Sequence, residues 1–249
     1  MGKRCLVAIC HNLPVVYRKT AQSLMEMGWG DRLARAKTAH GFETVDHAWF
    51  FRSPRVDALR DRAAVAAMDG PPGGAPYTHL LFLDADMVWP SNVIELMLAH
   101  HDKGIVSGLY FLKYPPYRPI ALRDGVETDG VWMYQHDKDY AESGGALRPE
   151  QVVGMGCTLI PVSVFAQLGP RPWFTYQNDA EGWPQVSEDV PFCRAAAAAG
   201  VDIWLDPTIK CGHILVDVID EKHGVRYKAS EQASQSAVTI SPVAEGSAA

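Results

Sequence analysis

The stretch LLFLDADMVWP, residues 80–90, indicates how the chain folds. Its first four residues form an unbroken apolar run, which is typical of a strand buried on both faces of a parallel sheet. Two aspartates, Asp84 and Asp86, follow at once, separated by one alanine. In an open α/β sheet, ligands bind beyond the carboxyl ends of the parallel strands. The stretch therefore predicts two carboxylates at the ligand-binding edge of such a sheet.

Segments with strand and helix character alternate along the first half of the chain and return near its end. Apolar runs predict strands over residues 4–10, 44–51, 78–83, 104–110 and 201–205. Helical spacing and strong helix formers predict helices over residues 15–27, 56–68, 91–99 and 190–199. A polar hairpin or loop region is expected over 123–150, and an aromatic loop over 170–187. The alternation indicates an α/β fold with a central, mostly parallel sheet flanked by helices.

Length and composition favour a single domain, and the cysteine pattern favours reduced thiols. A chain of 249 residues, 47% of them hydrophobic, can bury one full core, and we place that domain at 1–229. Residues 230–249 are small and polar and are expected to form a mobile tail. Five scattered cysteines without a C-x-x-C pair indicate reduced thiols, and hence a cytoplasmic protein. No apolar run approaches the roughly 18–20 residues of a membrane span.

Charge is distributed unevenly along the chain. Residues 1–62 hold 11 Lys or Arg against 6 Asp or Glu, although the whole chain has a net charge of −6. A basic N-terminal quarter joined to an acidic remainder favours an anionic ligand at one end of the molecule. Scattered surface charge without a function explains the counts equally well.

The paired aspartates suggest a divalent cation. Residues two apart on an extended segment face the same way, so Asp84 and Asp86 would share one crevice. Two adjacent carboxylates repel each other unless a cation neutralises them. Mg²⁺ or Mn²⁺, completed by water and ligand phosphates, fits such a pair. The alternative is a strand end whose aspartates lie in an ordinary turn.

The wider context of the pair resembles one enzyme family. THLLFLDADMVWP resembles the DxD segment of GT-A fold glycosyltransferases, particularly the family two-like group in its compact phage and bacterial form. The resemblance runs in order over roughly residues 4–215. It includes CLVAICHN, VDALRDRAAVAAM, GMGCTLIPVSVFAQLG and SEDVPFCRAAAAAGVDIWLDPTIKCGHI.

The resemblance implies a nucleotide-diphosphate sugar as donor and a role for several residues. His11 and Asn12, after the first strand, would border the nucleotide. Arg60 matches the family's helix before the DxD strand and would join Asp84 and Asp86 in donor binding. Asp61 stands where the family usually has Asn, which weakens any base contact there. The metal set would be Asp84, Asp86 and His213, with Mn²⁺ favoured over Mg²⁺ because imidazole suits it better.

The same resemblance implies which residues face the acceptor hydroxyl. Asp189, preceded by Glu188, would be the general base of an inverting transfer. Carboxylates at a helix N-terminus are also favoured by the helix dipole alone. Gly156 would lie near the acceptor. For His213, the alternative to a metal ligand is a structural histidine that is hydrogen-bonded in a turn.

Aromatic residues before Glu188 predict an acceptor pocket. Trp173, Tyr176 and Trp183 could stack on a sugar ring or on a nucleobase. Trp183, beside Gly182 and Pro184, would belong to a lid that closes over the bound donor. The competing interpretation is that these aromatics pack an irregular loop onto the domain.

Two other functions stay open at this point. One is a phage-type enzyme that glycosylates a hydroxymethylated DNA base, which would require base flipping. The other is a catalytically silent nucleotide-sugar-binding domain.

Overall fold

The computed structural model describes residues 2–11, 16–27, 29–51, 53–114, 116–128, 131–140, 144–178, 182 and 184–215. By its internal contacts the chain divides into two units, residues 1–214 and 215–249, and the described helices and strands all belong to the first. The predicted domain over 1–229 and the predicted tail over 230–249 reach beyond the described residues. Both therefore stay predictions.

The described part contains six helices and fourteen strands. The helices are α1 (Arg18–Glu26), α2 (Trp29–His40), α3 (Val56–Asp69), α4 (Val93–Leu98), α5 (Ser163–Gln167) and α6 (Asp189–Ala198). The strands of the main sheet are β1 (Lys3–Cys10), β2 (Phe42–Phe50), β3 (His79–Asp84), β5 (Ile105–Leu109), β8 (Arg148–Pro149), β10 (Cys157–Pro161) and β13 (Ile203–Lys210). The remaining strands are β4 (Met87–Val88), β6 (Ala121–Thr128), β7 (Val131–His136), β9 (Val152–Val153), β11 (Gln177–Asn178), β12 (Pro184–Val186) and β14 (Gly212–His213).

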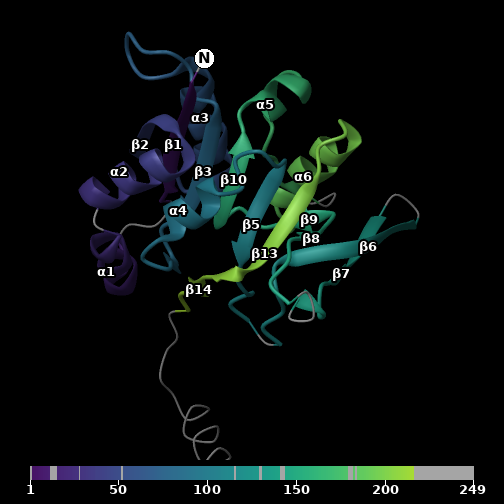
Figure 1. Cartoon of the computed structure of the whole chain (residues 1–249). Helices are drawn as coiled ribbons and strands as arrows, with labels where there is room; N and C mark the ends of the chain where they lie inside the picture. Colours follow the sequence, from purple (N-terminus) through teal and green to yellow (C-terminus); the bar gives the residue numbers. More distant parts are fainter. Residues whose placement is uncertain are drawn as a thin grey trace, which may run out of the picture. The chain divides into compact units, whose positions relative to one another are not determined.

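The main sheet has seven strands in the order β2-β1-β3-β10-β5-β13-β8 (Figure 1). Strands β1, β2 and β3 are parallel neighbours, and β5 and β13 form a second parallel pair. Strand β10 lies between the two groups and is antiparallel to both, and β8 is antiparallel to β13. The predicted α/β fold, with a mostly parallel central sheet flanked by helices, is confirmed. The direction of β10 was not anticipated from the sequence.

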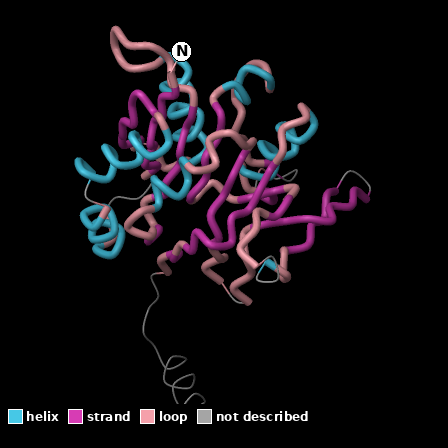
Figure 2. The backbone as a smooth tube through the Cα atoms, viewed as in Figure 1, coloured by secondary structure: helices cyan, strands magenta, loops and turns pink. Residues whose placement is uncertain are grey.

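Both faces of the sheet are covered, as the unbroken apolar run predicts. Leu80 and Phe82 of β3 pack in a cluster with residues of α3, α5 and α6. Leu81 and Leu83 alternate with them and pack in a second cluster with residues of α1, α2 and α4. All four side chains have 0% exposure. Burial of each of these side chains contributes roughly 1.5–3 kcal/mol to the free energy of folding. The strand therefore holds the sheet between two layers of helices (Figure 2).

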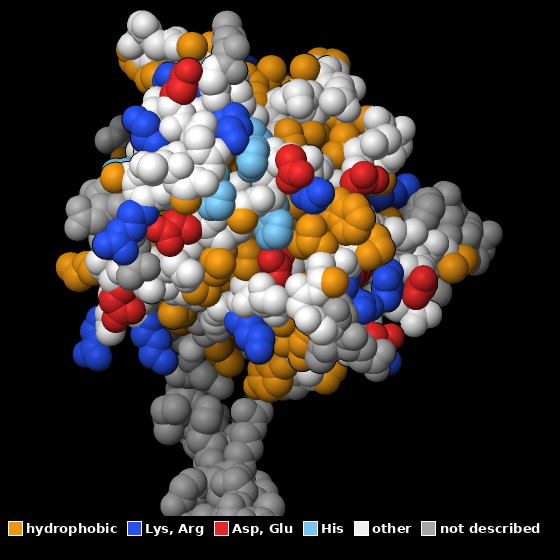
Figure 3. All heavy atoms as spheres, in the orientation of Figure 1, with side chains coloured by type: hydrophobic (Ala, Val, Ile, Leu, Met, Phe, Trp, Pro, Cys, Tyr) orange, Lys and Arg blue, Asp and Glu red, His pale blue; other side chains and the backbone are white. Residues whose placement is uncertain are grey.

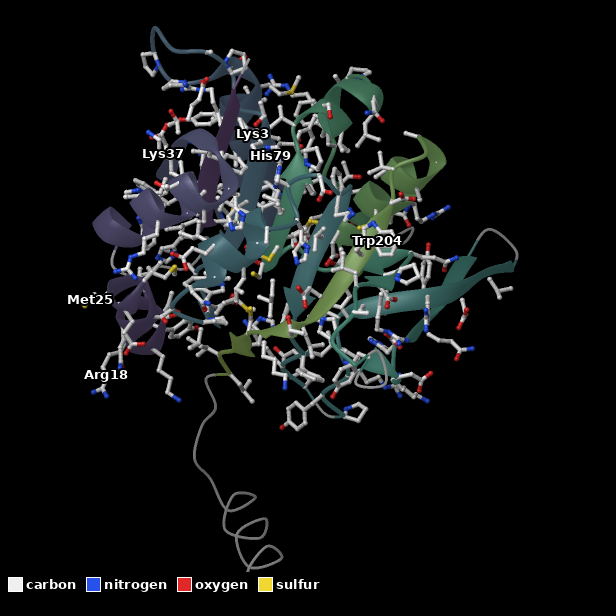
Figure 4. All side chains as sticks on the ribbon, in the orientation of Figure 1. Lys3, Arg18, Met25, Lys37, His79 and Trp204 are labelled. Atoms are coloured by element: carbon white, nitrogen blue, oxygen red, sulfur yellow. The ribbon has the colours of Figure 1, made fainter. Side chains whose placement is uncertain are left out.

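Helix α1 supports the segment that follows β3. The buried hydroxyl of Thr20 donates to the Met87 carbonyl (3.0 Å), and that of Ser23 donates to the Trp89 carbonyl (3.0 Å). The opposite side of the helix faces outward, where Arg18 and Met25 project from the body of the unit (Figure 4). Strand β4 is therefore held by α1 directly beyond Asp84.

Several expectations from the sequence can now be compared with the structure. The helix expected over 15–27 begins at Arg18, and the last strand extends to Lys210. The polar region 123–150 contains the expected hairpin, formed by β6 and β7. Helix α2 was not predicted. All five cysteines are buried and none is paired in a disulfide. None of the helices in the described ranges is long and apolar enough to cross a membrane.

Candidate functional site

The candidate site lies where β3 ends and the chain turns. Strand β3 ends at Asp84, and residues 85 and 86 form a turn that leads into β4. The expectation that Asp84 and Asp86 share one extended face is therefore wrong. Strand β4 pairs with β14, which sets His213 opposite Met87 and lets the Ile214 N–H donate to the Asp86 carbonyl (2.8 Å). This short ladder brings residues 212–214 beside the aspartate turn.

Asp84 is bound on both of its carboxylate oxygens by Arg60. Two guanidinium nitrogens of Arg60 donate to Asp84 at 3.0 and 2.8 Å, and Nε donates to Glu188 at 2.8 Å. Arg60 is only 4% exposed, so its bidentate geometry is held in a low-dielectric setting. Burial raises the pKa of Asp84, and the charge of Arg60 offsets part of that rise. Arg60 thus ties α3, β3 and the start of α6 together.

Asp86 faces a different set of partners. The ammonium group of Lys113 forms an ion pair with Asp86 Oδ2, and His213 Nε2 lies 3.7 Å from the same oxygen. Burial by itself would raise the pKa of Asp86, but His213 and Lys113 bring it down to about 2. Asp86 is therefore an ionised carboxylate that pairs with the ammonium group of Lys113 and lies near the imidazole ring of His213.

The ring of His213 is oriented by the backbone. The Phe111 carbonyl, which can only accept a hydrogen bond, lies 2.8 Å from Nδ1. Nδ1 therefore carries the hydrogen, and Nε2 is the ring nitrogen that lies on the side of Asp86 Oδ2. A second group that fixes one ring nitrogen is the usual arrangement around a metal-binding histidine.

These donors fit a partial site for Mn²⁺ or Mg²⁺. Within the described residues, no three His, Cys, Asp or Glu side chains gather closely enough to hold a metal ion on their own. A cation that keeps several waters and binds ligand phosphates needs only one or two protein ligands. Asp86 and His213 can supply these. Asp84 differs from them, because both of its carboxylate oxygens already accept hydrogen bonds from Arg60.

Asp189 is the first residue of α6, and its environment favours the protonated form. Burial and the neighbouring charge of Glu188 raise the pKa of Asp189 to about 6. The hydroxyl of Ser187 donates to its Oδ1. Glu188 stands at the N-cap position, yet its side chain forms no capping hydrogen bond and binds Arg60 instead. Capping does not account for Glu188, and Asp189 has the pKa of a group that can exchange protons near neutrality.

Tyr110 joins the two halves of the site and was not singled out from the sequence. Its ring lies against His213, with centroids 5.6 Å apart, and its hydroxyl accepts a hydrogen bond from the Gly156 N–H (2.9 Å). Burial raises its pKa well above the usual value, and the charges of Asp189 and Asp84 add to the rise. A Cβ at Gly154 would overlap the tyrosine hydroxyl. The two glycines between β9 and β10 are thus explained by the ring that they accommodate.

Two of the other residues proposed from the sequence lie near charged side chains of the site, and two lie outside the described residues. His11 is partly buried and feels the charge of Asp86, which opposes the lowering of its pKa by burial. Tyr176 lies close to the network, since burial and the charge of Glu188 raise its pKa to about 12. Asn12 and Trp183 lie outside the described residues.

Trp173 has contacts that agree with the packing alternative. Its ring lies 5.0 Å from that of Phe165, and its Nε1–H donates to the Gly169 carbonyl (2.9 Å). Its backbone N–H, like that of Phe174, donates to Asp61 Oδ1, at 3.0 and 3.2 Å. The carboxylate at position 61 thus anchors the aromatic loop, a role that its residue type alone does not reveal.

A separate cavity of about 520 Å³ lies beside α6. It is lined by Tyr134, Gln151, Gln177, Pro191, Arg194, Ala195, Ala197 and Ala198. At 3.6 residues per turn, Pro191, Arg194 and Ala198 lie on the side of α6 roughly opposite Asp189. This cavity is therefore distinct from the edge that carries Asp86 and Asp189.

Comparison with known proteins gives a likeness of fold. No protein-family model and no curated protein matches the chain. Among solved structures it is similar to A197 from STIV, with a TM-score of 0.50 and 18% identity over 86% of each chain. It is also similar to GalNAc-T7 with UDP, GalNAc and Mn²⁺, with a TM-score of 0.49, 15% identity, and coverage of 86% of this chain and 44% of that chain. At these identities the likeness concerns the fold alone.

Proposed function

We propose that the chain is a metal-dependent glycosyltransferase with a GT-A-like fold, which moves a sugar from a nucleotide-diphosphate sugar to an acceptor hydroxyl. The observation that carries this proposal is the Tyr110 ring, which lies against His213 and close to the charges of Asp84 and Asp189. A cation-binding pair and a carboxylate suited to proton transfer thus flank one buried side chain. The ordered sequence resemblance over residues 4–215 supports the same function.

Asp86 and His213 would hold the divalent cation, and Mn²⁺ suits the imidazole ligand better than Mg²⁺. When bound, such a cation neutralises the charge that develops on the departing diphosphate. Asp84 is proposed to act in donor binding, where its hydrogen bonds to Arg60 hold it in place. His11, near Asp86, would border the nucleotide together with Asn12.

Asp189 is proposed to be the general base. In an inverting transfer it accepts the proton of the acceptor hydroxyl while that oxygen bonds to the anomeric carbon. The bond from this carbon to the diphosphate oxygen breaks in the same step. A pKa of about 6 lets Asp189 be ionised at neutral pH and still accept a proton readily. Glu188 would position it through the ion pair with Arg60.

The acceptor is proposed to approach between Gly156 and the aromatic loop, where Tyr176 lies close to Glu188 and Asp189. Trp183, which lies outside the described residues, stays a candidate for the acceptor contact, whereas the contacts of Trp173 agree with packing. A hydroxyl on a glycan or protein is preferred to a base in DNA. On the face shown in Figure 3, acidic and basic side chains are interspersed, whereas DNA affinity rests on a broad basic surface.

A panel of nucleotide sugars tests the donor and the metal together. The full chain is heated with each nucleotide sugar in the presence of MnCl₂ or of EDTA. A true donor at 100 times its Kd should add roughly 2.7 kcal/mol to the free energy of unfolding, only with Mn²⁺. Transfer or slow hydrolysis of that donor should then be lost in Asp86→Ala.

Asp102→Ala is the matched control, because Asp102 is an exposed carboxylate that pairs with Lys103. It should leave binding and turnover unchanged. Full activity in EDTA, or in Asp86→Ala, would remove the metal role. Donor binding without any turnover would leave a silent nucleotide-sugar-binding domain.

A further inference from the structure

The loop that carries Lys113 has a fixed base and an exposed tip. Phe111 and Pro119 form an isolated β-bridge, and the Leu112 N–H donates to the Arg118 carbonyl (2.9 Å). The Phe111 carbonyl also accepts the hydrogen bond from His213. Beyond this base, Tyr114 is 70% exposed and Tyr117 is 48% exposed, so the tip is not packed into the core. The base of this loop thus lies beside His213, and the two tyrosines at its tip are exposed.

Lys113 and a divalent cation compete for one oxygen atom. The ammonium group is paired with Asp86 Oδ2, the oxygen that His213 Nε2 faces at 3.7 Å. A cation bound by that oxygen and by Nε2 would lie within a few Å of the ammonium group. Two positive charges at such a separation repel strongly in a partly buried site. Binding of the cation therefore requires Lys113 to leave Asp86.

Two of the carboxylates that the structure describes at this site already have a cationic partner. Asp84 and Glu188 are both committed to Arg60. A diphosphate bound to the cation on Asp86 would bring new negative charge to the place that Lys113 has just left. Lysine suits such an exchange, since its ammonium group is a compact charge on a flexible stem and binds phosphate as a point charge.

We propose that Lys113 is a further catalytic residue, a chain-borne cation that neutralises Asp86 before the metal binds and passes to the donor diphosphate afterwards. This role rests on the proposed glycosyltransferase function. Lys113 thereby opposes metal binding in the free protein and favours the diphosphate once the metal is bound.

Binding of Mn²⁺ alone tests the first half. The affinity of the full chain for Mn²⁺, followed by the electron paramagnetic resonance signal of the free ion, is measured without donor. Lys113→Gln should bind Mn²⁺ roughly tenfold more tightly than the wild type, because a competing charge is gone. Lys113→Arg keeps the charge and should stay near the wild type. Lys103→Gln, which alters an exposed lysine paired with Asp102, is the control.

Inorganic pyrophosphate tests the second half, since it carries the diphosphate without a base or sugar. With saturating Mn²⁺, pyrophosphate should raise the Tm of the wild type and of Lys113→Arg, and raise that of Lys113→Gln much less. Tighter binding of Mn²⁺ together with weaker binding of pyrophosphate in Lys113→Gln would indicate the exchange. If Lys113 had only a structural role, its replacement would weaken the binding of both ligands or of neither.

The outcomes separate this inference from the function on which it rests. If Mn²⁺ binding does not depend on Asp86, the proposed metal site fails and the exchange fails with it. If binding depends on Asp86 but is the same in Lys113→Gln, the exchange alone is overturned. If pyrophosphate does not raise the Tm of the wild type in the presence of Mn²⁺, the contact between Lys113 and the diphosphate is overturned.

Discussion

At the residue scale, Arg60 holds two carboxylates, the buried Glu188 and the partly buried Asp84. It is 4% exposed and binds Asp84 and Glu188 at once. Replacing it with Met keeps much of the side-chain length but leaves both carboxylates without a counter-charge. We expect Arg60→Met to lower the free energy of unfolding by about 3–5 kcal/mol, measured by urea denaturation at neutral pH.

A matched control for this substitution lies two residues further along the same helix. Arg62 is exposed and donates to the Phe51 carbonyl (3.1 Å). Arg62→Met should change the free energy of unfolding by no more than about 0.5 kcal/mol. If both variants lost the same free energy of unfolding, the ion pairs of Arg60 with Asp84 and Glu188 would contribute nothing to stability.

Asp189 is the residue on which turnover should depend most. Asparagine preserves its shape but cannot accept the acceptor's proton, so kcat should fall by roughly 10²–10⁴-fold in Asp189→Asn while the donor Kd stays the same. In the wild type, kcat should rise as pH increases through about 6, because the base must be ionised. The pH profile of kcat, with the exposed Asp202→Asn as control, measures both effects. Unchanged turnover would return Asp189 to a purely helix-stabilising role.

At the element scale, Asp61 connects α3 to the aromatic loop. Its Oδ1 accepts hydrogen bonds from the backbone N–H groups of Trp173 and Phe174. Asp61→Ala would leave both donors without a partner, and we expect a loss of about 1–3 kcal/mol in the free energy of unfolding. Asp61→Asn keeps an accepting oxygen and should lose less than half of that. A similar loss in both variants would show that the charge, rather than the hydrogen bonds, holds the loop.

The elements themselves were largely predictable, because their signals are local. The run over residues 80–83 identified a strand covered on both faces, and the strong helix formers over residues 190–199 identified α6. The direction of β10 was not predictable, since side chains alternate in the same way along parallel and antiparallel strands. Helix α2 was missed because the stretch WGDRLARAKTAH carries few large apolar residues to mark a buried stripe.

The candidate site was predictable as a set of residues but not as a set of contacts. Spacing placed Asp84 and Asp86 on one face, but the turn at residues 85–86 sends them to different partners. The partners of Arg60 lie 24 and 128 positions away in the sequence, so no motif could reveal the network. Tyr110 and Lys113 reach the site only through tertiary packing.

At the scale of the whole molecule, the ionised site is costly to fold. Four acidic side chains share one edge, and the two basic side chains that pair with them, Arg60 and Lys113, supply less charge than they carry. Proteins commonly retain such strain at functional sites, where removing it adds stability and removes activity. The titration of Asp189 makes this cost measurable as a dependence of stability on pH.

The folded-state pKa of Asp189 is raised to about 6 by burial and by Glu188, above the roughly 4 of an unfolded chain. A raised pKa means that the stability linked to this group is fully present below pH 4 and is lost as pH rises through 6. Asp189→Asn cannot ionise, so it should match the wild type near pH 4 and exceed it at pH 8. With a discount for its partial exposure, the gain at pH 8 should be about 1–2 kcal/mol. Urea denaturation of both proteins at the two pH values measures the difference, and a gain of equal size at both would show that side-chain shape, not charge, is responsible.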